Sequence, residues 1–184
     1  MTRILDIVFS LIALVILSPL LLIVAIAIRL ESPGSPIFRQ ERVGQGGQRF
    51  FMRKFRSMVR DAPKLGGYST RPGDPRITRI GRFIRSTSID ELPQLWNVLI
   101  GDMSLVGPRP DVPAQEGLYD PADWAKRLSI RPGVTGLAQV TRRSSATAAE
   151  RLEKDLQYVD NQSLGLYLAV LGGTVKLVLT KLAH

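Results

Sequence analysis

The chain contains no cysteine and only one histidine, and these two shortages exclude much of the usual chemistry of enzymes. Without cysteine there is no disulfide, no thiol nucleophile and no thiolate-bound zinc, which fits a chain that folds in the cytoplasm. The single histidine, His184, is the last residue, so we expect no hydrolase triad, histidine-bound metal or histidine general base. Carboxylates therefore remain as the main candidates for nucleophile and acid–base group.

Acidic residues are also scarce relative to basic ones. The chain has 25 Lys and Arg against 16 Asp and Glu, a formal net charge of +9. Such an excess favours an anionic partner: nucleic acid, acidic lipid headgroups or a phosphorylated small molecule. No nucleic-acid-binding module is recognisable, so no nucleic acid partner is expected. With 184 residues, 45% of them hydrophobic, the chain is long enough for one domain with a core of its own.

One apolar run, IVFSLIALVILSPLLLIVAIAI at 7–28, is long enough to cross a bilayer as a helix. A signal peptide fits poorly because its apolar core usually has about 7–15 residues. Arg3 precedes the run and Arg29 follows it, and positive charge at both ends suits two cytoplasmic ends. Ser18 and Pro19 lie in the middle, where proline kinks a helix and serine can satisfy the freed carbonyl. From these residues alone, a re-entrant helix and a spanning helix remain equally compatible with the run.

A glycine-rich turn follows the apolar run. Apolar and aromatic residues flank GQGG at 44–47, which predicts two strands joined in a β-hairpin. The turn is not a phosphate-binding loop, because it lacks the Walker lysine. On the second strand Lys54 and Arg56 alternate with Phe55 and therefore point to one side. They either guard a solvated strand edge or contact phosphate.

The central run, GRFIRSTSIDELPQLWNVLIGDMSLVGPRP at 81–110, holds the strongest helix pattern. The apolar residues Leu92, Leu95, Trp96 and Leu99 have the spacing of one buried helical face. Pro93 is tolerated only in a first turn, and Gly101 is a natural end. The pattern predicts a helix that begins near the acid pair that precedes Leu92.

That acid pair is Asp90 and Glu91, and it has two interpretations. Acidic residues commonly begin helices, Asp as the cap and Glu in the first turn. However, arginines recur every third residue upstream (Arg76, Arg79, Arg82 and Arg85), which predicts a cationic stripe that ends beside the acids. Arg109, in the loop GPRP, adds another guanidinium. Two carboxylates surrounded by arginines suit a site for a phosphorylated substrate.

Three blocks, KFRSM at 54–58, STSIDELPQLWNVLIGDMSLVGPRP at 86–110 and RPGVTGLAQV at 131–140, carry a resemblance to a known family. They resemble the bacterial sugar transferases, monotopic polyprenyl-phosphate phosphoglycosyl transferases, in the family's order and over almost the whole chain. The resemblance implies an α+β fold with a re-entrant membrane helix kinked at Ser18 and Pro19. A small β-hairpin and several amphipathic interfacial helices would follow, the last of them at 164–179. Residues 1–30 would be the membrane-embedded helix, and 31–184 a catalytic domain on the cytoplasmic face of the bacterial inner membrane.

The resemblance also implies an activity and roles for particular residues. The enzyme would move a sugar 1-phosphate from a UDP-sugar to polyprenyl (undecaprenyl) phosphate and release UMP, with Mg²⁺ as cofactor. Partners would be these two substrates and the lipid bilayer, with a homodimer as a further option. The implied residues are Asp90 as nucleophile, Glu91 with Asp90 at the metal, Lys54, Arg56, Arg85 and Arg109 at phosphate, and Arg131, Thr135 and Gln139 near the nucleotide.

A second hypothesis needs no catalysis. Clusters of Lys and Arg near a membrane segment ordinarily bind anionic lipid or nucleic acid through their total charge. A membrane-tethered binding protein of this kind would tolerate Asp90→Asn, whereas the enzyme would lose turnover. The substitution therefore separates the two hypotheses.

Overall fold

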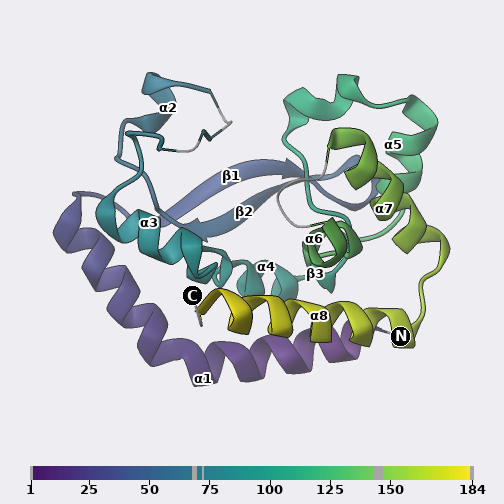
Figure 1. Ribbon diagram of the computed structural model, residues 1–184, viewed down its shortest axis with the longest axis horizontal. Coiled ribbons are helices and arrows are strands. Elements are labelled where there is room, and N and C mark those ends of the chain that lie inside the picture. Colours follow the sequence, from purple (N-terminus) through teal and green to yellow (C-terminus); the bar gives the residue numbers. More distant parts are fainter. Residues whose placement is uncertain (1, 68–69, 72, 143–146, 183–184) are drawn as a thin grey trace.

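The computed structural model describes residues 2–67, 70–71, 73–142 and 147–182, and helices dominate it (Figure 1). His184 lies outside the described residues. With η for 3₁₀ helices, the element order is α1 (Thr2–Glu31), β1 (Ile37–Val43), η1 (Gln45–Gly47), β2 (Arg49–Phe55), α2 (Ala62–Leu65), α3 (Arg79–Ser86), η2 (Ile89–Glu91), α4 (Gln94–Ile100), β3 (Ser104–Val106), η3 (Pro113–Leu118), α5 (Pro121–Arg127), β4 (Gly133–Thr135), α6 (Leu137–Arg142), α7 (Ala148–Asp160) and α8 (Leu164–Leu182).

The apolar run forms one continuous helix, α1, with Pro19 inside it. The Ser18 hydroxyl donates a hydrogen bond of 2.8 Å to the carbonyl of Val15, four residues before the proline. This is the carbonyl that Pro19 leaves without an amide donor. Figure 1 shows that α1 changes direction near its middle. By length and composition α1 could cross a membrane, and most of its large apolar side chains are exposed.

Polar side chains near both ends attach α1 to the rest of the molecule. The Arg3 guanidinium donates to the carbonyls of Val98 (2.6 Å) and Leu99 (2.9 Å), in the last turn of α4. Such a cation satisfies carbonyls that have no intrahelical partner. At the other end, the Glu31 carboxylate accepts the amides of Arg79 and Ile80 and so caps the N-terminus of α3.

The β-hairpin is an antiparallel pair, β1 and β2, with Ile37 opposite Phe55 and Val43 opposite Arg49. Helix α4 packs against β2 through Asn97, which is fully buried. The Asn97 side chain accepts the amide of Arg53 at 3.0 Å and donates to the carbonyl of Phe51 at 2.9 Å. It therefore supplies the hydrogen bonds that this edge of the hairpin would otherwise lack.

The acid pair does not begin the helix that the sequence predicted. Asp90 and Glu91 lie on the short turn η2, and α4 starts three residues later, with Pro93 as its N-cap. Gly101 ends α4 as expected, in the left-handed conformation (φ 97°). Trp96 was expected on the buried face but is exposed, because the side that packs against β2 carries Gln94, Leu95, Asn97 and Val98.

Strands β3 and β4 are short and parallel, with Ser104 opposite Gly133 and Val106 opposite Thr135. Three glycines let the two segments cross closely. A Cβ on Gly133 would lie 2.1 Å from the amide nitrogen of Gly107, and one on Gly136 would lie 2.4 Å from the carbonyl oxygen of Gly107. The GPRP loop after β3 and the turn after β4 are therefore held together.

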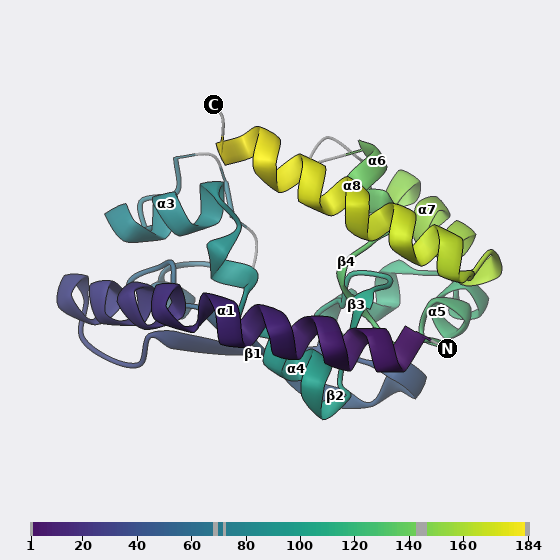
Figure 2. The same ribbon diagram turned by 90° about the horizontal axis from the view of Figure 1, so that it is seen from below.

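Two helices end the described chain, and α8 lies where the sequence predicted a helix at 164–179. Helix α7 begins with a capping box in which Thr147 and Glu150 bond each other's backbone. Helix α8 continues through Gly172 and Gly173. In Figures 1 and 2, α1 and α8 lie on the same side of the molecule, and both carry exposed large apolar side chains.

Candidate active site

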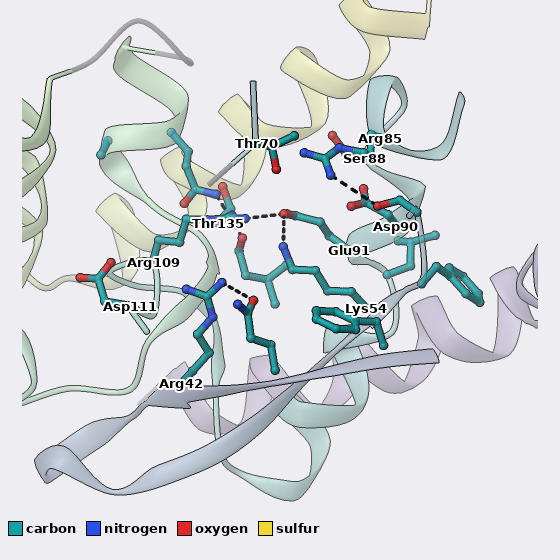
Figure 3. A pocket seen from close by; sticks show the side chains of 18 of the residues that line it. Arg42, Lys54, Thr70, Arg85, Ser88, Asp90, Glu91, Arg109, Asp111 and Thr135 are labelled. Carbon is teal, nitrogen blue, oxygen red and sulfur yellow. Dashed lines mark hydrogen bonds and ion pairs between the residues drawn. The ribbon is translucent and has the colours of Figure 1, made fainter. Parts of the chain in front are cut away.

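A groove of about 1590 Å³ lies between the hairpin, α3 and η2 on one side and α6, α7 and α8 on the other. Most of its polar lining comes from segments far apart in sequence: Arg42 and Lys54 on the hairpin, Arg85 on α3, Asp90 and Glu91 on η2, Arg109 and Asp111 on the GPRP loop, and Thr135 on β4 (Figure 3). The fold thus brings the acid pair together with Arg85, Arg109 and Lys54.

The turn that carries the acid pair has a strained entry. Ser88 has φ 62°, the only positive φ of a non-glycine residue in the described part of the chain. A non-glycine residue in this region costs of the order of 1 kcal/mol or more, and such residues cluster at functional sites. Its carbonyl accepts the amide of Glu91 at 3.2 Å, which closes the turn. Asp90 and Glu91 consequently face the groove instead of capping α4.

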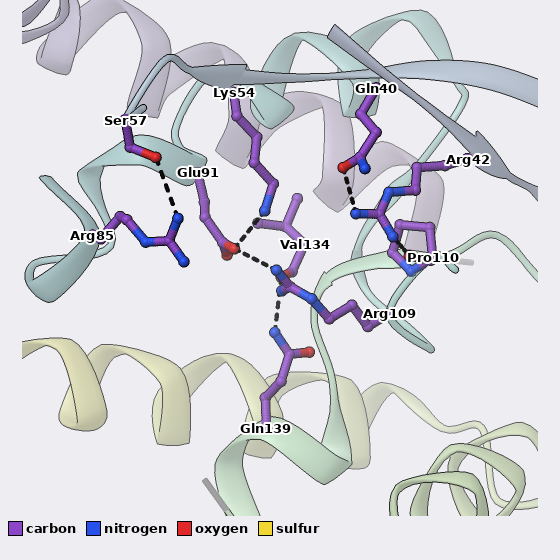
Figure 4. Close-up of polar contacts among 10 residues, drawn as sticks. All are labelled: Gln40, Arg42, Lys54, Ser57, Arg85, Glu91, Arg109, Pro110, Val134 and Gln139. Atoms are coloured by element: carbon purple, nitrogen blue, oxygen red, sulfur yellow. Dashed lines mark hydrogen bonds and ion pairs between the residues drawn. The ribbon is translucent and has the colours of Figure 1, made fainter. Parts of the chain in front are cut away.

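Glu91 is held by two cations (Figure 4). Its Oε1 accepts from the Arg109 guanidinium at 2.6 Å and from the Lys54 ammonium at 3.0 Å. Burial by itself would raise the pKa of Glu91, but the charges and hydrogen bonds of Arg109 and Lys54 outweigh it and hold the pKa well below its usual range. Glu91 is therefore a permanent anion, and the two cations hold it in one position.

Asp90 differs from its neighbour although the two are adjacent. Within the described residues its carboxylate makes no hydrogen bond or ion pair. Burial and, next, the charge of Glu91 raise the pKa of Asp90 to about 6, against the opposing effects of Lys54, Arg85 and Arg109. A poorly solvated carboxylate with free oxygens is a stronger nucleophile than one tied up in hydrogen bonds.

Arg85 reaches the groove from the last turn of α3, and its guanidinium lies 3.5 Å from the Ser57 hydroxyl (Figure 4). Of the other arginines of the predicted stripe, Arg79 and Arg82 are exposed and do not line the groove. Arg76 precedes α3 and does line the groove, where it bonds Asp74 at 2.7 Å. The arginines do not form one stripe because each three-residue step turns by about 60° around a helix, so Arg79, Arg82 and Arg85 point in different directions.

Lys54 and Arg56, which the sequence predicted on the same side of a strand, have different partners. Lys54 bonds Glu91, as described, whereas β2 ends at Phe55 and Arg56 turns toward the start of the hairpin. The Arg56 guanidinium donates to the carbonyls of Ser32 (2.6 Å) and Pro33 (2.8 Å). Arg56 lines the groove, but its guanidinium donates to the turn that links α1 to β1. Its hydrogen bonds therefore hold this turn in place.

Of the three residues predicted near the nucleotide, two line the groove and one does not. Thr135 and Gln139 line the groove, with the Thr135 hydroxyl 2.8 Å from that of Thr174 and the Gln139 amide donating to the carbonyl of Val134 at 3.3 Å. Arg131 does not line the groove, and its guanidinium donates to the carbonyl of Gly101 at 3.0 Å. Arg131 therefore joins the end of α4 to the start of β4.

Two arginines that sequence reasoning missed, the partly buried Arg42 and the buried Arg127, support the site. Arg42 on β1 donates to the carbonyl of Pro110 at 3.0 Å and to the Gln40 side chain at 2.6 Å. Arg127, on α5, is only 5% exposed and contacts Asp111 and Asp155. No pattern in the sequence marked Arg127, since a basic residue in the last turn of a helix is expected from the helix dipole alone.

The resemblance implies Mg²⁺, and the carboxylates of the groove are its candidate ligands. No group of three or more His, Cys, Asp or Glu side chains able to hold a metal occurs among the described residues. Mg²⁺ is, however, commonly held by one or two carboxylates together with substrate phosphates. The free oxygens of Asp90 and the second oxygen of Glu91 fit that mode, and they do not form a complete protein site.

Taken together, the fold and the groove define a class of protein: one with a carboxylate pair among cations, suited to phosphorylated substrates, beside a helix long and apolar enough for a membrane. The chain belongs to the bacterial sugar transferase family, whose profile matches residues 1–181.

Named relatives agree with this family. The chain is 44% identical over 187 residues to a UDP-glucose:undecaprenyl-phosphate glucose-1-phosphate transferase of Caulobacter vibrioides, covering 97% of this chain and 69% of the relative. It is 42% identical to a UDP-N-acetylgalactosamine-undecaprenyl-phosphate N-acetylgalactosaminephosphotransferase of Aeromonas hydrophila (95% of this chain, 43% of the relative). It is also 43% identical to an exopolysaccharide production protein of Rhizobium leguminosarum (97% and 95%). The chain thus spans less than half the length of some relatives and nearly all of another.

Proposed function

We propose that this protein is a phosphoglycosyl transferase that moves a sugar 1-phosphate from a UDP-sugar to undecaprenyl phosphate and releases UMP, an early membrane step of polysaccharide assembly. The names of the relatives support this reaction. The structural observation that carries it is the contrast between Glu91, tied to two cations, and Asp90, whose carboxylate is free in the same groove. A merely cationic lipid-binding surface has no need of this contrast.

The free carboxylate supports a two-step reaction. An Asp90 oxygen attacks the phosphorus that bears the sugar. The bond between this phosphorus and the oxygen that bridges the two phosphates breaks, and UMP leaves with the bridging oxygen. An oxygen of undecaprenyl phosphate then attacks the same phosphorus, which forms the diphosphate and frees the Asp90 carboxylate. Ping-pong kinetics follow from this order.

The surrounding cations have separate tasks in this scheme. Two anions must approach each other, so positive charge is needed at the transferred phosphate. Arg85 lies on one side of Asp90, whereas Arg109 and Lys54 lie on the side of Glu91. Mg²⁺, when bound by Asp90 or Glu91 and by substrate phosphate, would neutralise charge on the leaving group. Thr135 and Gln139 offer polar groups to the nucleotide.

We place α1 in the inner membrane as a re-entrant helix, with the groove on the cytoplasmic face and α8 at the interface. The Ser18–Val15 bond at Pro19 and the bend in Figure 1 support this arrangement. Because the chain has no cysteine, single Thr2→Cys and Ser35→Cys variants can be labelled with an impermeant maleimide. Labelling of both from the cytoplasmic side supports the re-entrant helix, and labelling from opposite sides supports a spanning one. Pairing of two copies stays a prediction.

The deciding experiment is UMP release from a panel of UDP-sugars by the purified protein, with Mg²⁺ and with or without undecaprenyl phosphate. We expect repeated turnover that depends on the lipid, with at most one equivalent of UMP per enzyme without it, from one donor by the wild type and by Asp160→Asn, a surface control whose partner is the exposed Lys126. Asp90→Asn should abolish release. Full activity of Asp90→Asn would contradict the proposed nucleophile, and no release from any donor by the wild type would contradict the function.

A further inference from the structure

We propose that Arg127 is a positioning residue: together with Asp155 it holds the backbone of the GPRP loop so that the Arg109 guanidinium meets Glu91 in the groove. The proposal rests on the proposed function for its activity readout, although the geometry stands without it. Neither the family profile nor the sequence patterns assign a role to Arg127 or Asp155.

The loop that carries Arg109 is tied by its carbonyls, four in succession. The carbonyl of Pro108 accepts the amide of Gly133 at 2.8 Å, and that of Asp111 accepts the amide of Val43 at 3.0 Å. Between them, the carbonyl of Pro110 accepts from the Arg42 guanidinium at 3.0 Å, and that of Arg109 itself accepts from Arg127 at 2.5 Å. Two prolines cannot donate in this loop, so its path depends on donors from other elements: two backbone amides and the guanidinium groups of Arg42 and Arg127.

Arg127 is itself held rigidly. Its guanidinium donates to Asp111 at 2.5 Å and to Asp155, on α7, at 2.8 Å. It also lies over the rings of Tyr119 (5.5 Å) and Trp124 (5.9 Å). Burial opposes its charge, but Asp111 and Asp155 outweigh that effect and raise the pKa of Arg127, so it stays charged. Because all three nitrogens of this planar group donate to acceptors, the Arg127 guanidinium holds the Arg109 carbonyl in one position.

The contact that matters for chemistry is the one to the Arg109 carbonyl. This carbonyl and the side chain that reaches Glu91 at 2.6 Å belong to the same residue, Arg109. A shift of the loop would displace the Arg109 guanidinium and release Glu91 from one of its two cations. Asp155 lies on α7, whose Arg151 and Leu152 also line the groove, so the arrangement connects that wall to Arg109.

The test is a double-mutant cycle between Arg127→Lys and Arg109→Lys. Lysine keeps the charge next to Asp111 and Asp155 but cannot reach three acceptors at once. Arg127→Lys should lower kcat/KM for the UDP-sugar by at least tenfold, since a displacement of about 1 Å can cost about 100-fold. The double variant should be no slower than Arg109→Lys alone, within about twofold, because both changes remove the same positioned group. Lys126→Met, a basic residue on the same helix paired at the surface with Asp160, is the matched control and should keep full activity.

The same cycle is measured in binding of inorganic pyrophosphate by calorimetry, which needs no turnover. If the fold-losses caused by Arg127→Lys and Arg109→Lys multiply in the double variant, in kcat/KM or in pyrophosphate binding, the positioning role is overturned. Arg127 would then be a residue of the core only. If Arg127→Lys does not fold, Asp155→Asn replaces it and should give a smaller loss with the same non-additivity. Absence of turnover in the wild type would contradict the proposed function alone, whereas absence of pyrophosphate binding by the wild type would contradict both.

Discussion

Two neighbouring carboxylates acquire opposite properties from their surroundings. Glu91 is close to Arg109 and Lys54 and remains ionised, whereas Asp90 faces the groove with no hydrogen-bond donor among the described residues, and burial raises its pKa to about 6. Environments that separate the pKa values of adjacent acids are typical of sites that assign them different tasks. The sequence predicted a guanidinium from Arg109 near this pair, and the structure places both Arg109 and Lys54 against Glu91. Their contact with substrate phosphate stays a prediction.

The first prediction concerns the pH dependence that Asp90 imposes. Attack requires its ionised form, so kcat/KM should fall as the pH decreases through about 6. The same raised pKa means that ionised Asp90 destabilises the fold above pH 6. At pH 7.5 the free energy of unfolding of Asp90→Asn should therefore exceed that of the wild type by about 1 kcal/mol, after allowance for the partial exposure of Asp90. This gain in stability, seen as a higher melting temperature, should vanish below about pH 4. Thermal unfolding in detergent at several pH values measures it, and a destabilised Asn variant at pH 7.5 would contradict the explanation.

At the scale of elements, the position of α3 decides where Arg85 lies. Glu31 and Thr78 cap this helix at its N-terminus, and Gly81 lets it pack against the chain after β2. A Cβ on Gly81 would lie 2.0 Å from the carbonyl oxygen of Ser57, the residue whose hydroxyl neighbours Arg85. Backbone contact of this closeness cannot be relieved by a side-chain rotation.

The second prediction compares two helical glycines. Alanine favours a helix by about 1 kcal/mol over glycine, so Gly172→Ala on α8, where a Cβ meets nothing within 4 Å, should be neutral or stabilising. Gly81→Ala should instead destabilise the protein by about 2 kcal/mol or more, because the clash exceeds the gain in propensity. It should also reduce turnover by displacing Arg85. Melting temperatures and UMP release of the two variants decide the matter, and equal behaviour would show that α3 can move freely.

For the whole molecule, the long apolar helix α1 is also part of the scaffold that holds the groove. Asp6, on α1, is 2% exposed, and its Oδ1 accepts from the Ser104 hydroxyl (3.0 Å), the Leu105 amide (2.9 Å) and the Tyr167 hydroxyl (2.8 Å). One carboxylate therefore joins α1, β3 and α8. Strand β3 leads directly into the loop of Arg109, so the attachment of α1 and the active site depend on each other.

The third prediction removes that junction. Asp6→Ala leaves three buried donors without an acceptor and should cost about 3 kcal/mol or more, whereas Asp6→Asn keeps an acceptor oxygen and should cost less. Turnover should fall with stability in the same order, while co-sedimentation with lipid vesicles stays unchanged because the apolar face of α1 is intact. Ile16→Ala, at a position 69% exposed on the same helix, is the control and should leave turnover unchanged. Unchanged turnover and stability in Asp6→Ala would contradict a shared scaffold.

The family, the apolar helix and its proline, the strands around the glycine turn and the acid pair with Arg85 and Arg109 could be predicted from the sequence. These follow from local patterns: hydrophobic periodicity, turn residues and a contiguous motif. The packing of distant elements was needed to show that Lys54 reaches Glu91, that Arg56 and Arg131 bond backbone carbonyls, that Trp96 is exposed, and that Arg127 contacts the Arg109 carbonyl. An arginine next to a motif can bind phosphate or a carbonyl with the same donors, and only the position of distant elements selects between them.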